Sequence, residues 1–303
     1  MSTCSASSRA LSEPLAATAA TARTWLFVEQ PGPWGPKAVT QSHLDPALGR
    51  ALERAAAGTG VRVALIRRPG RHPDRHRPAR RRVYLAHTLP GRSWVRTAVL
   101  DGPEPLRELD ASAMTALGAG EHGGRWEPYG GDPLALVCTN GRRDRCCALL
   151  GRPLATELAA GGTGEVWETT HLGGHRFSPT LLVLPHGYAY GRLAGHAVKG
   201  LLDELRRGRV VTDGCRGRSA WDRPGQAAEL AVRALTGERG ADALTVTGAE
   251  GTAPEWRVTV HGPGGLSWCA TVVADTAVPP LPASCGGVSE PLPRMAVTAV
   301  VPR

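Results

Sequence analysis

Two long stretches of the chain have the same order of predicted strands and helices, and this repetition limits most strongly how the chain can fold. In the second stretch we predict a strand at residues 133–138, a helix at 146–160, strands at 166–170, 177–184 and 188–193, and a helix at 196–207. The corresponding segments of the first stretch are 24–28, 44–57, 61–66, 83–87, 94–100 and 106–117. Helical spacing of apolar residues marks the helices, and short apolar runs bounded by Gly and Pro mark the strands. This order predicts an α/β fold in which the first helix of each stretch crosses between two strands.

We interpret the repetition as a duplicated unit whose first copy has lost its cysteines; two α/β units that merely share a common order are the alternative. The predicted parts are a flexible N-terminal tail at 1–22, a degenerate α/β domain at 23–130, a second α/β domain at 131–214 and a small α+β extension at 215–303. In the extension, a helix at 221–235 precedes alternating strands that would form an antiparallel meander. An arginine-rich segment at 67–82 is predicted to be a mobile loop.

The composition is that of a globular protein, with 42% hydrophobic and 21% charged residues. The uninterrupted apolar runs are far shorter than a membrane span, and residues 1–22 contain no apolar segment of signal-peptide length. We therefore expect a cytoplasmic protein. Its net charge of +9 comes from arginine far more than from lysine, since Lys37 and Lys199 are the only lysines. This imbalance is typical of GC-rich coding, so nucleic acid is not expected as a partner.

The seven cysteines have no regular spacing of the kind that marks a disulfide-stapled secreted domain. Three of them, Cys138, Cys146 and Cys147, lie within ten residues, at the end of a predicted strand and the start of the next helix. Unpaired N–H groups at a helix start stabilise a thiolate. Crowding of this kind favours metal or redox chemistry over cross-linking.

A pair of histidines follows in a predicted turn. His171 and His175 are four residues apart and flank the sequence Leu-Gly-Gly, whose glycines let the backbone fold so that both rings converge. Thiolates and imidazoles delivered in pairs from two turns make a closed four-ligand site. Either Cys146 or Cys147 can supply the second thiolate.

The motifs around these residues resemble the sucrase/ferredoxin-like family of thioredoxin-fold ferredoxins. They read Leu-Val-Cys138-Thr-Asn-Gly-Arg-Arg-Asp144-Arg-Cys-Cys147, Val-Trp167-Glu-Thr-Thr-His171-Leu-Gly-Gly-His175-Arg-Phe and Leu-Pro185-His-Gly-Tyr-Ala-Tyr-Gly-Arg192. Two N-terminal motifs, Glu-Gln-Pro-Gly-Pro-Trp-Gly35 and Leu-Ile-Arg-Arg-Pro-Gly70, extend the resemblance to most of residues 12–220. The resemblance implies that the second α/β domain is a thioredoxin-like ferredoxin domain and that the first is a degenerate copy of it.

The resemblance further implies a [2Fe–2S] cluster held by Cys138, Cys147, His171 and His175, with Cys146 as the alternate to Cys147. The expected role is that of an electron carrier without catalytic residues, rather than an enzyme. Histidine ligation predicts a higher, pH-dependent reduction potential than ligation by cysteines alone. No pair of carboxylates is set up for sucrase chemistry.

Arginines around the cluster loops, at positions 142, 143, 145, 152 and 176, either dock an acidic redox partner or form a solvated rim. Two other functions stay open for the same residues. The ligand set suits a structural Cys₂His₂ zinc module equally well. A thiol–disulfide oxidoreductase is the third hypothesis, although the sequence contains no Cys-x-x-Cys.

Overall fold

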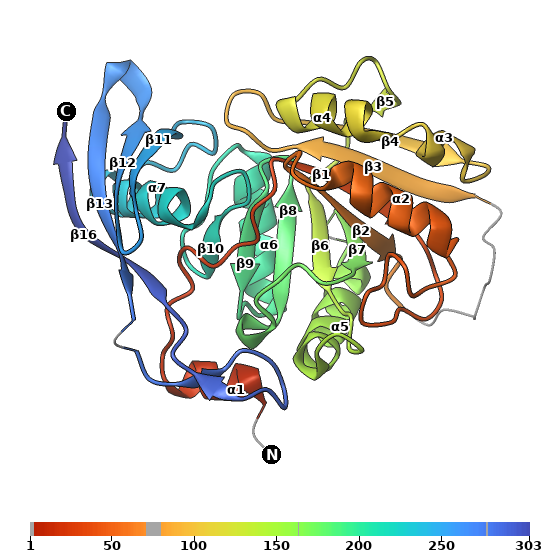
Figure 1. Cartoon of the computed structure of the whole chain (residues 1–303), viewed down its shortest axis with the longest axis horizontal. Coiled ribbons are helices and arrows are strands. Elements are labelled where there is room, and N and C mark those ends of the chain that lie inside the picture. The colour runs from red at the N-terminus through yellow and green to blue at the C-terminus, as the bar shows by residue number, and fades with distance from the viewer. Residues whose placement is uncertain (1–2, 71–79, 163, 277) are drawn as a thin grey trace.

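The computed structural model describes residues 3–70, 80–162, 164–276 and 278–303 and contains one large sheet (Figure 1). Its ten strands run in the order β10-β9-β8-β6-β7-β2-β1-β3-β4-β5. Seven α-helices accompany the sheets in this part of the chain, which confirms the predicted mixed α/β class. None of the described helices has the length and apolar character needed to cross a membrane.

The first half of the large sheet follows the predicted order of elements. Its elements are β1 (Thr24–Glu29), α2 (Pro46–Ala56), β2 (Val61–Arg67), β3 (Arg81–His87), β4 (Trp94–Leu100), α3 (Glu104–Arg107), α4 (Ala111–Ala119) and β5 (Glu127–Pro128). Strand β1 pairs in parallel with β2 and antiparallel with β3, which in turn pairs antiparallel with β4. The helix predicted at 106–117 is two helices, because Asp110 caps α4 through its side chain. Residues 71–79 of the predicted arginine-rich loop lie outside the described residues.

The second half has the same pairing. Its elements are β6 (Leu134–Cys138), α5 (Arg145–Ala160), β7 (Glu165–Thr169), the short 3₁₀ helix η1 (His175–Phe177), β8 (Thr180–Leu184), β9 (Tyr188–Gly191), α6 (Gly195–Arg206) and β10 (Cys215–Arg218). Strand β6 is parallel to β7 and antiparallel to β8, and β8 is antiparallel to β9. Each half therefore contains the same four-strand arrangement.

The two halves join edge to edge through β2 and β7, which run antiparallel and pair Ile66 with Thr169 and Arg67 with Glu168. The side chains of Arg67 and Glu168 form a buried ion pair across this seam, with Nη2 and Oε2 2.6 Å apart. One apolar cluster contains buried residues from both halves, including Trp25 and Trp167. The helix-covered side of each half has its own cluster.

The C-terminal part is a second, smaller unit. It consists of α7 (Arg223–Thr236), an antiparallel sheet of β11 (Thr245–Thr252), β12 (Glu255–His261), β13 (Ser267–Asp275) and β16 (Arg294–Pro302), and a two-stranded sheet of β14 (Leu281–Pro282) and β15 (Ser289–Glu290). Helix α7 packs its buried alanines and Val232 against this antiparallel sheet. The antiparallel sheet and α7 give this unit both helix and strand, and β14 and β15 lie in a stretch rich in Pro and Gly.

The N-terminal segment differs from the flexible tail that we predicted. Residues Cys4–Ala10 form helix α1, which lies beside β14 and η1 (Figure 1). Thr3 caps the helix, and the Ser5 hydroxyl donates a hydrogen bond to the carbonyl oxygen of Ser178 at 3.2 Å. Cys4 is only 1% exposed. Tertiary contacts thus order a segment whose small polar residues carry no apolar periodicity.

Candidate metal centre

The cysteines of the first motif lie where β6 meets α5. Cys138 is the last residue of β6, and Cys146 and Cys147 lie in the first turn of α5. Asp144 is the N-cap of this helix, and its Oδ1 accepts a hydrogen bond from the backbone N–H of Cys146 at 2.8 Å. Gly151 lets the helix approach the strand end, because a Cβ there would lie 2.1 Å from the Cys138 carbonyl oxygen.

The histidines lie on the turn that follows β7. Gly173 and Gly174 have φ values of +83° and +69°, in the left-handed region that side chains other than hydrogen disfavour. A Cβ on Gly174 would also lie 2.1 Å from a guanidinium nitrogen of Arg216. This buried arginine donates a hydrogen bond to the Gly173 carbonyl oxygen at 3.1 Å, which holds the turn against β10.

Three of the four predicted ligands come together in the structure. The donor atoms of Cys138, Cys147 and His171 all lie within 4.8 Å of one another. The ring of His175 is next to that of His171, with the centroids 5.0 Å apart, but its Nε2 faces Oδ2 of Asp144 at 3.6 Å. Both Nδ1 atoms of the two histidines are buried and have no hydrogen-bond partner among the described residues. The structure thus places one imidazole beside two thiols and the second imidazole next to the first, and both Nδ1 atoms lack a partner in the described part of the chain.

The two thiols of this group share a proton unequally. A hydrogen bond from the Cys147 thiol lowers the pKa of Cys138 well below its usual range; burial opposes this shift, whereas His171 and the Leu172 backbone N–H add to it. The same hydrogen bond, together with burial, raises the pKa of Cys147. The opposite shifts make Cys138 the sulfur that ionises more readily, and a bound cation would favour ionisation of both sulfurs.

Asp144 is a second charged group beside the histidines. Burial raises its pKa, but hydrogen bonds from the backbone N–H groups of Cys285 and Cys146 and the nearby His175 outweigh burial, so the pKa is lowered. Burial lowers the pKa of His175, although Asp144 works in the opposite direction. At neutral pH the arrangement is a carboxylate facing a neutral imidazole, the form of histidine that binds metals.

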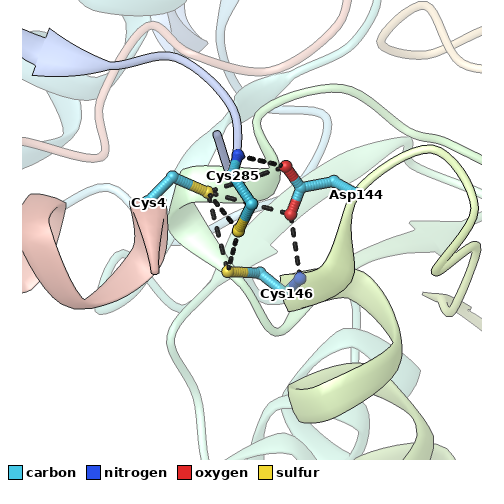
Figure 2. A group of neighbouring side chains, drawn as sticks. All are labelled: Cys4, Asp144, Cys146 and Cys285. Atoms are coloured by element: carbon cyan, nitrogen blue, oxygen red, sulfur yellow. Dashed lines mark hydrogen bonds between the residues drawn. The ribbon is translucent and has the colours of Figure 1, made fainter. Parts of the chain in front are cut away.

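Cys146, the alternate ligand in the sequence interpretation, points away from Cys138. Its sulfur lies 3.6 Å from that of Cys4 and 3.3 Å from that of Cys285, next to Asp144 (Figure 2). Sequence reasoning missed both Cys4 and Cys285, because they are far from the motif along the chain. Four of the seven cysteines lie outside the motif, and this remainder was the one feature of the sequence that could have drawn attention to Cys4 and Cys285.

The surface next to His171 is hollowed and mostly basic. A depression of about 450 Å³ is lined by His171, the cations Lys37, Arg62 and Arg143, and the carboxylate of Glu53. The other arginines that we expected around the loops are divided. Arg142 and Arg152 line a neighbouring depression, Arg145 is exposed, and Arg176 pairs with Glu13 at 2.8 Å.

Similarity to known proteins identifies the family of the chain. The profile of the sucrase/ferredoxin-like family matches residues 15–217, about two thirds of the chain. The chain belongs to the sucrase/ferredoxin-like family. It is also similar to Altered inheritance of mitochondria protein 32 of Meyerozyma guilliermondii, with 30% identity over 97 residues. That match covers 28% of this chain and 34% of the yeast protein, so the chain spans about a third of that relative's length. No solved structure matches the chain significantly.

The family match covers the two groups of metal-binding candidates to different extents. Cys138, Cys147, His171 and His175 all lie inside the matched region 15–217. Cys4 and Cys285 lie outside it, one on each side. Asp144 and Cys146 lie inside the matched region, so the match covers all four predicted ligands but only two residues of the second group.

Proposed function

We propose that the protein is an electron carrier that holds a [2Fe–2S] cluster through Cys138, Cys147, His171 and His175. The observation that carries this proposal is the meeting of two buried thiols and an imidazole, with donors within 4.8 Å, in a chain of the sucrase/ferredoxin-like family. Iron–sulfur clusters take cysteine thiolates, and in some centres two histidines replace two cysteines. When bound, the cluster would accept and release one electron.

The chain supports this role by what surrounds the donors. Cys138 and Cys147 are fully buried, whereas His171 is half-buried and reaches the surface depression. An electron entering from a partner would therefore pass on the histidine side. The Nδ1 atoms of both histidines have no hydrogen-bond partner among the described residues, and such nitrogens would be available to coordinate the iron of a cluster.

The depression next to His171 fits an acidic redox partner. Lys37 and Arg143 are exposed at its rim, and Arg62 adds a half-buried charge. Complementary charge speeds encounter and orients the two proteins more than it tightens binding. Leu149, 55% exposed on the first turns of α5, supplies apolar surface near the same loops.

The test is the metal content and the spectrum of full-length protein made under anaerobic, iron-replete conditions. We expect about two irons and two sulfides per chain and, after one-electron reduction, a spin-half EPR signal with an average g value in the range of histidine-ligated centres. Stoichiometric zinc in the first group, without iron, would overturn the proposal in favour of a structural zinc module. A Cys138–Cys147 disulfide that cycles under a dithiol reductant, in iron-free protein, would instead favour an oxidoreductase.

A further inference from the structure

Three cysteine sulfurs from distant parts of the chain meet beside the N-terminus of α5. The sulfurs of Cys4, Cys146 and Cys285 are 3.6, 3.3 and 3.6 Å apart (Figure 2). Four tetrahedral zinc–sulfur bonds of about 2.3 Å would hold neighbouring sulfurs about 3.8 Å apart. The three thiols are thus arranged nearly as the face of a zinc tetrahedron.

A carboxylate completes the group. Both oxygens of Asp144 lie 3.8 Å from the Cys4 sulfur, and the oxygens accept backbone N–H bonds from Cys146 and Cys285 at 2.8 Å each. These bonds fix the carboxylate in place, and each oxygen retains a lone pair for a metal. Carboxylate oxygen is an accepted zinc donor beside thiolates.

Three of these four side chains are buried and Cys285 is partly exposed, so the group requires a counter-charge if the sulfurs are to ionise. Cys4, Cys146 and Asp144 are at most 4% exposed. No lysine or arginine makes an ion pair with Asp144 among the described residues, and the nearby imidazole of His175, 3.6 Å away, is neutral at pH 7. A divalent cation would compensate the buried carboxylate and the thiolates, which is the arrangement that closed structural metal sites share.

The position of the group in the fold suggests its role. Cys4 lies on the short helix α1, Cys285 lies between the two-residue strands β14 and β15, and Cys146 lies on the core helix α5. Helix α1 contacts both η1 and β14, and β14 is only two residues long. Metal binding supplies folding free energy to segments of this kind.

We propose that Cys4, Asp144, Cys146 and Cys285 bind a structural zinc ion that fastens both end segments of the chain to the start of α5. This site is separate from the Cys138–Cys147 centre, and its zinc would be present whether or not that centre holds iron. It also gives the adjacent Cys146 and Cys147 different tasks, one in each group. A disulfide fits less well, since three thiols at similar distances would leave one unpaired.

The test uses full-length protein made anaerobically with both metals supplied. Elemental analysis should find about one zinc per chain, and zinc-edge X-ray absorption should show about three sulfurs near 2.3 Å and one oxygen. Cys4→Ser and Cys285→Ser should each lose at least tenfold of the zinc while keeping the content of the Cys138–Cys147 centre. Cys269→Ser, at a cysteine buried in β13, is the matched control and should keep the zinc.

Three results separate the inference from the proposed function. Zinc that shows two sulfurs and two nitrogens, and that is lost in Cys147→Ser but not in Cys4→Ser, would overturn the second site and place zinc in the first group. A disulfide among Cys4, Cys146 and Cys285 in zinc-free protein would also overturn it. One zinc lost in Cys4→Ser, in protein that carries no iron, would support the second site while the electron-carrier proposal fails.

Discussion

The two halves of the large sheet have the same strand pairing, yet among the described residues only the second half gathers metal donors. Asp45 caps α2 in the first half as Asp144 caps α5 in the second, and each accepts a 2.8 Å hydrogen bond from the backbone N–H two residues later. Three residues after its cap, the first half has Leu48 buried in its apolar core where the second half has Cys147. The comparison teaches that the fold supplies a strand end facing a helix start, and that single side chains decide whether this place is a core or a metal site.

The largest effect should come from the cysteines that distinguish the halves. We expect Cys138→Ser and Cys147→Ser each to lower the iron content at least tenfold, because each removes a thiolate ligand. Cys146→Ser should keep the iron, since its sulfur lies with Cys4 and Cys285 instead. Iron and sulfide assays with EPR check this. Iron loss in Cys146→Ser with retention in Cys147→Ser would reverse the assignment, and Cys215→Ser, at a buried cysteine of β10, is the control.

Exchanging one histidine for cysteine should sharpen the comparison further. His175→Cys is expected to lower the reduction potential by about 200 mV, because thiolate donates more charge than imidazole. The wild-type potential should fall with rising pH by up to about 59 mV per unit once oxidation acidifies the second ring nitrogen. The variant should have a flatter profile, since a thiolate carries no such proton. Voltammetry across the neutral and alkaline range measures both, and a flat wild-type profile would argue against histidine ligands.

The seam between the halves depends on a buried charge pair. Glu168→Ala should lower the free energy of unfolding by about 3–5 kcal/mol, because it leaves the buried guanidinium of Arg67 without its carboxylate. Glu168 also accepts a hydrogen bond from the Thr139 hydroxyl at 2.9 Å. Glu165→Gln is the control, since its pair with Arg68 across the same seam is exposed and worth under about 1 kcal/mol. Urea unfolding compares the two variants, and equal losses would show that burial does not set the strength of the seam.

The smallest expected effect concerns a titrating residue in the first half. His87 is the last residue of β3, and the corresponding strand of the second half, β8, ends with Leu184. Burial is the main cause that lowers the pKa of His87 to about 4, and nearby arginines lower it further. The unfolded chain binds this proton below about pH 6.5, whereas the folded chain binds it only near pH 4, so stability falls as the pH drops through that window. We expect a loss of about 2–3 kcal/mol. His87→Asn should reduce this acid dependence in denaturant titrations, and the exposed His196→Asn should not.

Sequence reasoning succeeded where the signal was local. Apolar spacing and Gly/Pro boundaries located β1, α5 and β8 to within a few residues, and the cap at Asp144 is readable from the sequence alone. The crowding of Cys138 and Cys147 likewise marked the strand end and the helix start that the structure brings together. Such features depend on residues that are neighbours along the chain.

The parts that sequence reasoning missed depend on distant partners. Strands β2 and β7 are about a hundred residues apart in the sequence, and neither strand's sequence indicates that it pairs with the other. The meeting of Cys4 with Cys285 has the same character, because it depends on how α1 and the loop after β14 pack on α5. The N-terminal residues lack an apolar stripe and therefore gave no sign that they would be buried.

The pairing of β2 with β7 also bears on how this sheet behaves toward other molecules. A strand edge with free N–H and C=O groups is a template for pairing with another chain. On its own, the first half would expose such an edge along β2, and the second half would expose one along β7. The antiparallel seam pairs two residues of each strand, Ile66 with Thr169 and Arg67 with Glu168, and so covers part of both edges within a single chain. The outer borders of the sheet are the two-residue β5 and the four-residue β10, which are too short to recruit a foreign strand. Fusion of the halves thus leaves less strand edge open to a foreign strand than two separate halves would, independently of any metal bound at the loops.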